Sequence, residues 1–246
     1  MNQKVRGACR VLVIVPAYNE AGNILSTLTD LRENTAYDCL VVDDGSTDET
    51  LLLCREYGVP VVSFPMNLGI GGAVQAGYKY AYRNAYDVAV QFDGDGQHDA
   101  TFIVSLVAAL EDEHFNMAIG SRFSSDFEDN FKSTRMRRVG IRWLSGVIYL
   151  FTHQVITDPT SGFRAVDRAV MKLFCESYPV DYPEPESAVV VLSHGLKIKE
   201  VGVMMNERKN GLSSIGSLSA MYYMVKVTLA VMTQSASRVR GHKKCL

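Results

Sequence analysis

Short apolar segments alternate with longer amphipathic segments through the first 120 residues of this 246-residue chain. Each apolar segment is rich in Val, Ile, Leu or Phe and is too brief for a helix. Strands are expected at residues 11–15, 40–42, 59–64, 88–92 and 116–119. Helical periodicity occupies the intervals at about residues 21–33, 48–57, 72–84 and 100–112. This alternation predicts an α/β fold with a mostly parallel sheet flanked by helices on both faces.

Polar clusters follow three of these expected strands. Residues 16–20 (PAYNE) come after the first strand, 43–46 (DDGS) after the second, and 92–99 (FDGDGQHD) at the end of the fourth. In such a sheet, ligands bind at the carboxyl ends of the parallel strands, near the point where the strand order reverses. We therefore expect the three clusters to line one crevice.

The segment 92–99 has two interpretations when it is taken alone. Asp and Gly favour solvated turns for backbone reasons. The same residues suit a divalent cation, which prefers oxygen ligands and a chain that bends tightly around it. The metal interpretation is favoured because two more acidic clusters are expected at the same edge. His98 is then expected beside the metal site or at the surface, and not as a zinc ligand.

The net charge of −2 conceals an uneven distribution. Residues 1–131 hold 8 Lys/Arg against 19 Asp/Glu, whereas residues 132–246 hold 17 against 8. The basic half suggests an anionic partner such as a phosphate, a nucleic acid or a membrane surface. The five cysteines show no CxxC or zinc-site spacing, which suits the reducing cytosol. No signal peptide is expected, because the first apolar run is short and ends in a polar turn.

Five segments occur in an order that resembles the family-2 glycosyltransferases. They are VPAYNE, VVDDGSTDET, FDGDGQHD, GSR at 120–122 and TSGFR at 160–164. The resemblance covers about residues 10–214 and is strongest to the branch with dolichyl-phosphate mannosyltransferase and its bacterial polyprenyl-phosphate relatives. It implies a GT-A type nucleotide-sugar-binding domain over residues 1–214. It also implies metal-assisted transfer of a sugar from a nucleoside diphosphate, with inversion at the anomeric carbon.

The resemblance assigns a metal site to the acidic segment. Asp93 and Asp95 match a DxD-like pair, and Gln97 is implied as a third ligand. Oxygen ligation suits Mg²⁺ or Mn²⁺. Such an ion offsets the charge that develops on a departing diphosphate. Asp95 is therefore also expected to be catalytic.

The resemblance also implies a set of nucleotide-sugar-binding residues. Those after the first strand would line the base and ribose pocket, those after the second would accept hydrogen bonds from base or ribose, and two arginines would face phosphate. The set is Pro16, Ala17, Tyr18, Glu20, Asp43, Asp44, Asp93, Gly94, Arg122 and Arg208.

Several of these segments have simpler alternatives. Residues 44–46 suit a turn in which Ser46 caps the next helix, as Asp99 is expected to cap another. Arg122 suits a surface salt bridge. The Gly-rich segment 67–72 lacks the ending of a P-loop and does not follow the first strand. It is expected to begin a helix whose backbone packs closely.

Two segments bear on the acceptor. In the resembling branch a late arginine and a lysine six residues further on hold phosphate. Here Arg208 occupies the first position and Ser214 the second, which weakens the case for a polyprenyl-phosphate acceptor. A phosphate acceptor needs no general base, whereas a sugar hydroxyl does. Glu184 or Glu186 is the candidate base, unless both only occupy the first turn of a helix.

The carboxyl-terminal residues 215–246 are expected to form an amphipathic helix and a basic tail. Residues 215–233 include Lys226 and lack the roughly 20 continuous apolar residues that would span a bilayer. Arginines and apolar residues also surround Trp143. Both segments suit an anionic membrane surface, and the alternative is packing on the domain or in a homodimer. Residues 124–138 are expected to form a long loop.

These features predict an inverting, divalent-metal-dependent glycosyltransferase, located in the cytoplasm or at the inner face of the membrane. It would transfer a sugar from a nucleoside-diphosphate sugar to a lipid-linked acceptor, either polyprenyl phosphate or a glycan hydroxyl, in cell-surface glycan synthesis. The alternative is a nucleotidyltransferase of similar fold, although PAYNEAGN is not the basic Gly-rich loop such enzymes carry. A module that binds nucleic acid or another anionic polymer is disfavoured, because no recognition motif is present.

Overall fold

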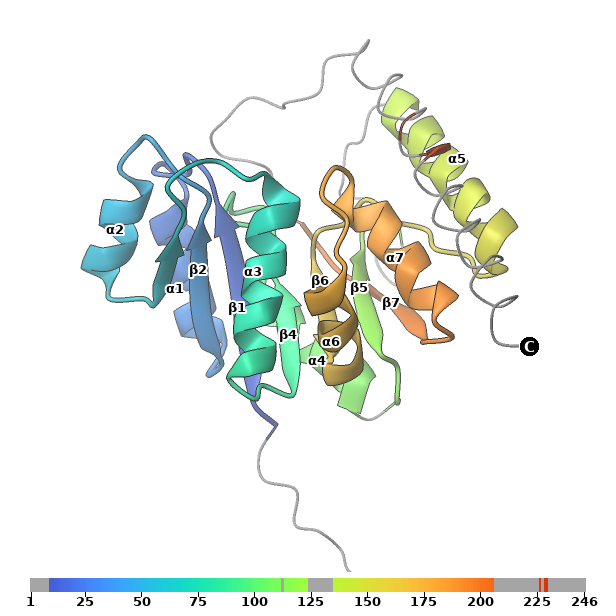
Figure 1. The fold of residues 1–246 in the computed structure, drawn as a ribbon, viewed down its shortest axis with the longest axis horizontal. Coiled ribbons are helices and arrows are strands. Elements are labelled where there is room, and N and C mark those ends of the chain that lie inside the picture. The colour runs from blue at the N-terminus through green and yellow to red at the C-terminus, as the bar shows by residue number, and fades with distance from the viewer. Residues whose placement is uncertain (1–8, 112, 124–134, 206–225, 227, 230–246) are drawn as a thin grey trace, which may run out of the picture.

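The computed structural model describes residues 9–111, 113–123, 135–205, 226 and 228–229. Within these residues one sheet holds seven strands in the order β3-β2-β1-β4-β6-β5-β7 (Figure 1). The strands are β1 (Val11–Ala17), β2 (Asp38–Asp43), β3 (Val61–Ser63), β4 (Val88–Gln91), β5 (Met117–Ser121), β6 (Arg164–Asp167) and β7 (Ile198–Gly202). Neighbouring strands are parallel except where β6 pairs with β4 and β5. The prediction of a mostly parallel sheet is confirmed.

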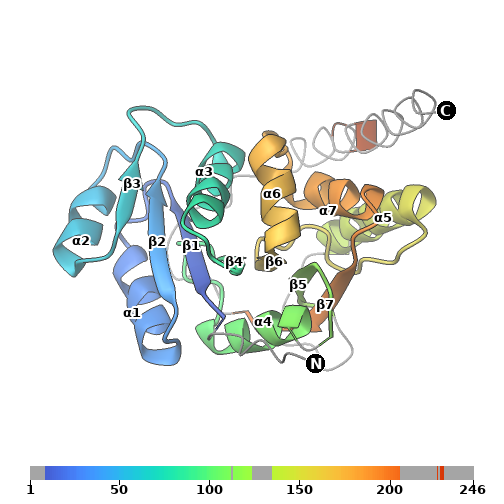
Figure 2. The same ribbon diagram turned by 60° about the horizontal axis from the view of Figure 1, so that its bottom comes forward.

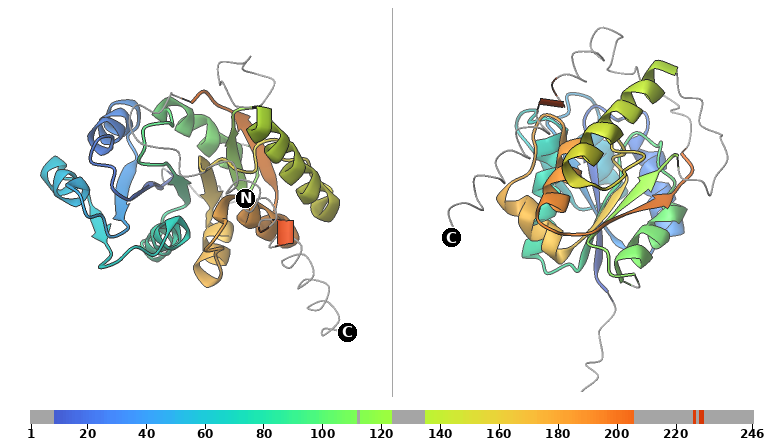
Figure 3. Two further views of the ribbon diagram at one scale, coloured as in Figure 1. Left: turned by 90° about the horizontal axis from the view of Figure 1, so that it is seen from above. Right: turned by 90° about the vertical axis from the view of Figure 1, so that its right-hand side faces the viewer.

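Helices cover both faces of this sheet (Figure 2). One face carries α1 (Ile24–Asn34), α2 (Thr50–Tyr57) and α4 (Ile103–Glu111), which follows a short 3₁₀ helix. The other face carries α3 (Ile70–Arg83), α5 (Arg135–Thr152), α6 (Arg168–Glu176) and α7 (Pro183–Ser193). Figure 3 shows α5 at the end of the molecule furthest from α2.

Each face of the sheet has its own hydrophobic core because strand side chains alternate between faces. On β1, Leu12 and Ile14 belong to the core under α3 and α6. Val13 and Val15 belong to the core under α1 and α4. A strand buried on both faces is expected to be continuously apolar, as VLVIV is. The central strand β1 is therefore packed on both sides, and the loop at its carboxyl end starts from this core.

Two strands were absent from the sequence prediction. β6 is short, and its sequence RAVD begins and ends with a charged residue. β7 lies at the edge of the sheet, and its sequence IKEVG has Lys199 and Glu200 at its centre. Neither has the apolar run that marks the strands buried on both faces.

Two local expectations are wrong. Residues 135–138 begin α5 instead of extending a loop, and residues 124–134 lie outside the described part of the chain. Ser46 does not cap α2, which begins at Thr50; its hydroxyl accepts a hydrogen bond from the Asn19 amide at 3.0 Å. Asp99 does cap the 3₁₀ helix, since its side chain accepts from the Thr101 amide.

Most of the expected carboxyl-terminal helix lies outside the described residues. Within 215–246 the structure describes only residues 226 and 228–229, which are helical. In the part of the chain that the structure describes, no helix has the length and hydropathy needed to cross a membrane.

Candidate active site

A cavity of about 310 Å³ opens at the carboxyl ends of β1, β2 and β4. It is lined by Pro16, Ala17, Tyr18, Glu20, Asp44, Asn67, Gly69, Ile70, Ala73, Asp93, Gly94, Asp95 and Glu184. The three polar clusters predicted to meet at one edge of the sheet do contribute to one cavity. Nine of these thirteen lining residues were expected at the site from the sequence.

The loop after β1 is fixed to the loop after β2 by hydrogen bonds. Asn19 has a positive φ of 54°, and its side-chain oxygen accepts from the Thr47 amide at 2.8 Å. The Glu20 amide donates to the Thr50 hydroxyl at 2.8 Å. The Asp44 amide donates to the Ala17 carbonyl at 2.9 Å. Because both loops are tied together, this wall of the cavity is preorganised.

The two adjacent aspartates after β2 have different positions. Asp43 is buried behind the wall, where its carboxylate accepts from the Ser63 hydroxyl at 2.7 Å and the Ser46 amide at 3.2 Å. Asp44 lines the cavity and accepts from the Leu68 amide at 2.7 Å. Burial raises the pKa of the Asp44 carboxyl, and its backbone hydrogen bonds oppose that effect. A contact between Asp43 and a nucleotide stays a prediction.

His98 contacts the first residue of the acidic pair Asp93 and Asp95, which follows β4. The Asp93 amide donates to His98 Nδ1 at 3.1 Å, and His98 Nε2 lies 3.6 Å from Asp93 Oδ2. The His98 ring is buried and stacks on Phe163 with centroids 4.8 Å apart. Burial lowers the pKa of His98, so the ring is neutral near pH 7. His98 therefore positions the backbone of the pair and is not a surface residue.

Asp95 and Gln97 differ in whether they line the cavity. Asp95 lines the cavity, and its Oδ1 accepts from the Gln97 amide at 3.1 Å. Gln97 itself is not among the lining residues, so its role as a metal ligand stays a prediction.

The cavity wall is strongly acidic. It includes Glu20, Asp44, Asp93, Asp95 and Glu184, and no Lys or Arg is among its described lining residues. Within the described residues no group of three or more His, Cys, Asp or Glu side chains could hold a metal ion. A pair of carboxylates does fit Mg²⁺ or Mn²⁺, because such ions usually keep waters and take further oxygens from substrate phosphates.

Both candidate general bases lie in the first turn of α7, as the simpler alternative predicted. Glu184 lines the cavity, whereas Glu186 is 8% exposed and does not. Burial raises the pKa of Glu184, Asp93 adds to the effect, and Arg164 opposes it. Burial raises the pKa of Glu186 to about 7, and Asp181 adds to the effect. Of the two, only Glu184 is among the residues that line this cavity.

Arg122, one of the two expected phosphate-binding arginines, is not among the described residues that line the cavity. Arg122 donates two hydrogen bonds of 2.7 Å to Asp158, whose side chain is fully buried. Arg122 therefore forms a salt bridge, but the pair is buried and not at the surface as the alternative expected, since the Arg122 side chain is 6% exposed. A contact of Arg122 with phosphate stays a prediction. Arg208 and Ser214 lie outside the described residues.

The loop between β3 and α3 was not predicted to line the site. It contributes Asn67, Gly69 and Ile70 to the cavity. The expectation of close backbone packing is confirmed, since a Cβ on Gly71 would lie 2.6 Å from the Val180 carbonyl oxygen. The Gly-rich composition of the segment was the available signal, but it indicated only the packing.

Known proteins are similar to this chain in sequence. A model of the family Glycosyl transferase family 2 matches residues 12–174. UDP-N-acetylglucosamine–dolichyl-phosphate N-acetylglucosaminyltransferase of Methanococcus voltae is 29% identical, with 78% of this chain and 84% of that protein covered. Polyprenol monophosphomannose synthase of Mycolicibacterium smegmatis is 28% identical, with 96% and 92% covered.

A solved structure shows the same fold. Glucosyl-3-phosphoglycerate synthase from Mycobacterium tuberculosis, in complex with Mn²⁺, UDP-glucose and phosphoglyceric acid, matches with a TM-score of 0.69 at 20% identity. The match covers 93% of this chain and 80% of that chain. The fold and the family together define an enzyme that transfers sugars and has a GT-A type domain. The chain belongs to glycosyl transferase family 2.

Proposed function

We propose that the protein is an inverting, divalent-metal-dependent glycosyltransferase that takes a sugar from a nucleoside-diphosphate sugar. The acceptor is a lipid-linked phosphate, and the enzyme acts at the inner face of a membrane in the synthesis of cell-surface glycans. The observation that carries the proposal is the acidic cavity, which lacks basic residues among its described lining. A diphosphate would be repelled from this wall unless a cation entered with it.

Different residues of the cavity would bind different parts of the donor. Asp93 and Asp95 would hold Mg²⁺ or Mn²⁺, which supplies positive charge next to the departing diphosphate. Tyr18 and Glu20 lie on the wall formed by the fixed loop after β1, where they would bind the nucleoside. Asp44 and Glu184 also line the cavity, and there they would accept hydrogen bonds from hydroxyl groups of the donor.

The phosphate acceptor is supported by the names of the two relatives, one of which specifies a dolichyl phosphate and the other a polyprenol monophosphomannose product. A phosphate oxygen is already ionised, so no side chain has to remove its proton. Glu184 then contributes binding and not proton transfer. With a glycan hydroxyl as acceptor, Glu184 would be the base, because Glu186 does not reach the cavity.

Hydrolysis of the donor tests the proposal directly. Purified protein is incubated with UDP-, GDP- and dTDP-sugars, with and without Mn²⁺, and release of the nucleoside diphosphate is measured. We expect release from at least one donor only when the metal is present. Release that is equal with and without metal would contradict metal dependence, and no release from any donor, even with polyprenyl phosphate added, would contradict the function.

Substitution of Gly162 tests whether Asp93 holds the metal. An added Cβ would lie 2.6 Å from Asp93 Oδ2, so Gly162→Ala is expected to displace this carboxylate. We expect the affinity for Mn²⁺ with a nucleoside diphosphate to fall by about 10-fold or more, measured by calorimetry. Gly146→Ala is the control, since its Cβ would meet no atom within 4 Å. Unchanged affinity in Gly162→Ala would argue against Asp93 as a ligand.

A further inference from the structure

Gln91 is buried at the end of β4 and contacts the first residue of the acidic pair. It is 1% exposed, and its Nε2 donates to Asp93 Oδ1 at 3.4 Å. Among the described residues, this is the one hydrogen bond that reaches the Asp93 carboxylate. The Asp93 side chain is 33% exposed and lines the cavity. Gln91 therefore contacts the carboxylate from within the protein.

The contact with Asp93 sets the orientation of the Gln91 amide. In the opposite orientation the amide oxygen would face a carboxylate oxygen, and neither of these atoms can donate. Nε2 therefore faces Asp93, and Oε1 lies on the other side of the amide. Oε1 is buried and has no hydrogen-bond partner among the described residues. A buried polar atom without a partner is costly, so native proteins contain few of them.

The Tyr78 hydroxyl is the other buried side-chain atom without a hydrogen-bond partner in the described part of the chain. Tyr78 is fully buried and lies within α3. Burial raises the pKa of its hydroxyl, so the phenol keeps its proton and can donate. The two atoms are therefore complementary, because the Tyr78 hydroxyl donates and Gln91 Oε1 accepts.

Both side chains lie on the same face of the sheet. Tyr78 belongs to the core on the α3 face, and so does Ala89 of β4. Gln91 follows Ala89 by two residues, and strand side chains alternate between faces, so Gln91 also points toward α3.

The charges around Tyr78 indicate the same neighbourhood. Beyond the effect of burial, the pKa of Tyr78 is lowered by Arg164 and raised by Glu184 and Asp93. Arg164 lies directly opposite Gln91 in the pairing of β4 with β6. The Tyr78 hydroxyl and the Gln91 amide therefore share one buried polar region beneath the cavity.

We infer that Gln91 is a positioning residue for Asp93, and that the Tyr78 hydroxyl, linked to Gln91 Oε1 through one buried water, holds the amide in place. The inference rests on the proposed function for the metal, because Asp93 is a proposed ligand. A water is the linker because the two atoms make no direct hydrogen bond with each other, and one water would satisfy both. Held in this way, the carboxylate would already face the cavity when the cation arrives.

The first test measures the affinity for metal. Gln91→Met removes both polar ends of the amide and keeps a side chain of similar length. We expect the affinity for Mn²⁺ with a nucleoside diphosphate, measured by calorimetry, to fall by about 10-fold or more. In donor hydrolysis, the metal concentration that gives the half-maximal rate should rise, and excess metal should largely restore the rate. A lower maximal rate with unchanged metal dependence would show a structural role only and overturn the inference.

The matched control is Gln75→Met. Gln75 is a half-buried glutamine of α3, and its Nε2 donates to the Phe174 carbonyl at 3.0 Å. It is not among the residues that line the cavity. We expect its affinity for Mn²⁺ with a nucleoside diphosphate to be that of the unaltered protein. An equal fall in this control would show a general effect of losing an amide and would overturn the inference.

The second test uses metal-free protein and addresses the link to Tyr78. Tyr78→Phe removes only the hydroxyl. We expect it to lower the melting temperature of the unaltered protein and to have no such effect when Gln91→Met is already present. If the hydroxyl has no partner at all, its removal should leave the melting temperature unchanged or raise it. That result would overturn the link.

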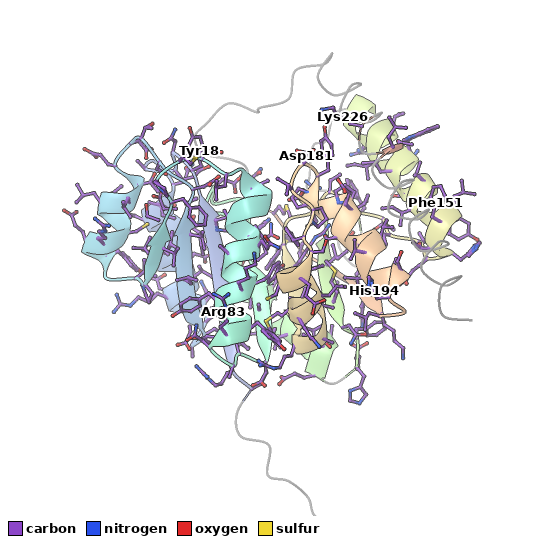
Figure 4. All side chains as sticks on the ribbon, viewed as in Figure 1. Tyr18, Arg83, Phe151, Asp181, His194 and Lys226 are labelled. Atoms are coloured by element: carbon purple, nitrogen blue, oxygen red, sulfur yellow. The ribbon has the colours of Figure 1, made fainter. Side chains whose placement is uncertain are left out.

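Tyr86→Phe is the control for the second test. The Tyr86 hydroxyl donates to Asp38 at 2.8 Å. Tyr86 follows Arg83, which Figure 4 shows at the end of α3 away from Tyr18 of the cavity. We expect its effect on the melting temperature to be the same with and without Gln91→Met. An effect that also disappears in Gln91→Met would show a general loss of cooperativity and overturn the specific link.

The two tests separate this inference from the proposed function. If the unaltered protein binds no Mn²⁺ with any nucleoside diphosphate, the proposed function and the inference both fail. If it binds the metal and Gln91→Met binds it equally tightly, only the inference fails.

Discussion

Replacing Asp95 with Asn is expected to reduce sugar transfer by about 100-fold or more. Asn preserves the size of the side chain and an oxygen that can accept from the Gln97 amide, so the loop should keep its shape. It removes one of the two negative charges that would hold the cation in the cavity. The measurement is the rate of nucleoside diphosphate release from the donor that the unaltered protein uses.

A thermal shift separates loss of the metal site from loss of structure. A ligand at 100 times its dissociation constant stabilises a protein by about 2.7 kcal/mol. For a chain of this size, that corresponds to a rise of roughly 5–10 °C in the melting temperature. We expect Mn²⁺ with nucleoside diphosphate to give this rise for the unaltered protein and for Asp99→Asn, whose side chain caps the 3₁₀ helix outside the cavity lining. The same rise in Asp95→Asn would contradict the assignment of the metal to this pair.

The main features of the site were predictable because they depend on where each buried strand ends in the sequence. Strands that are buried on both faces have an unmistakable apolar sequence, and the end of each such strand marks the edge where ligands bind. Tyr18, Glu20 and the Asp93–Asp95 segment follow directly from that rule, and the structure places all of them on one cavity.

Other features depend on contacts between distant residues and were not accessible to the same reasoning. Asp43 and Asp44 are adjacent and chemically identical, yet only Asp44 lines the cavity, because strand alternation turns Asp43 toward Ser63. The partner of Arg122 is Asp158, which is 36 residues away. The short antiparallel β6 has the sequence RAVD, whose charged first and last residues leave no apolar run to mark a strand.

Arg164 illustrates the same limit, since a charged residue in a TSGFR segment would ordinarily be assigned to the surface. The structure buries it to 1% exposure at the start of β6. Its guanidinium donates to the Ser161 carbonyl at 2.7 Å, the Pro159 carbonyl at 3.0 Å and the Ser187 hydroxyl at 2.7 Å. These bonds join the loop before β6 to α7, the helix that carries Glu184.

Replacing Arg164 with Met is therefore expected to destabilise the protein by about 3 kcal/mol or more, because three buried acceptors lose their donor. For a chain of this length, the melting temperature should fall by roughly 6–12 °C. Arg168→Met is the matched control: this arginine is exposed and packs over Tyr82, so about 1 kcal/mol or less is expected. Equal losses in the two variants, measured by urea unfolding, would contradict a structural role for the buried arginine.

Arg164→Lys tests whether the charge itself matters to the site. The positive charge opposes the rise in the pKa of Glu184, so a lysine at the same position should largely preserve the protonation of this carboxyl. Lysine cannot reproduce the fork of donors, so the stability should still fall. In Arg164→Met the pKa of Glu184 should rise further, and the carboxylate would then be lost from the cavity at a higher pH. We expect the acid limb of the pH profile of donor hydrolysis to move upward in Arg164→Met and to move less in Arg164→Lys. Identical profiles in the two variants would show that Arg164 acts through packing and hydrogen bonds alone.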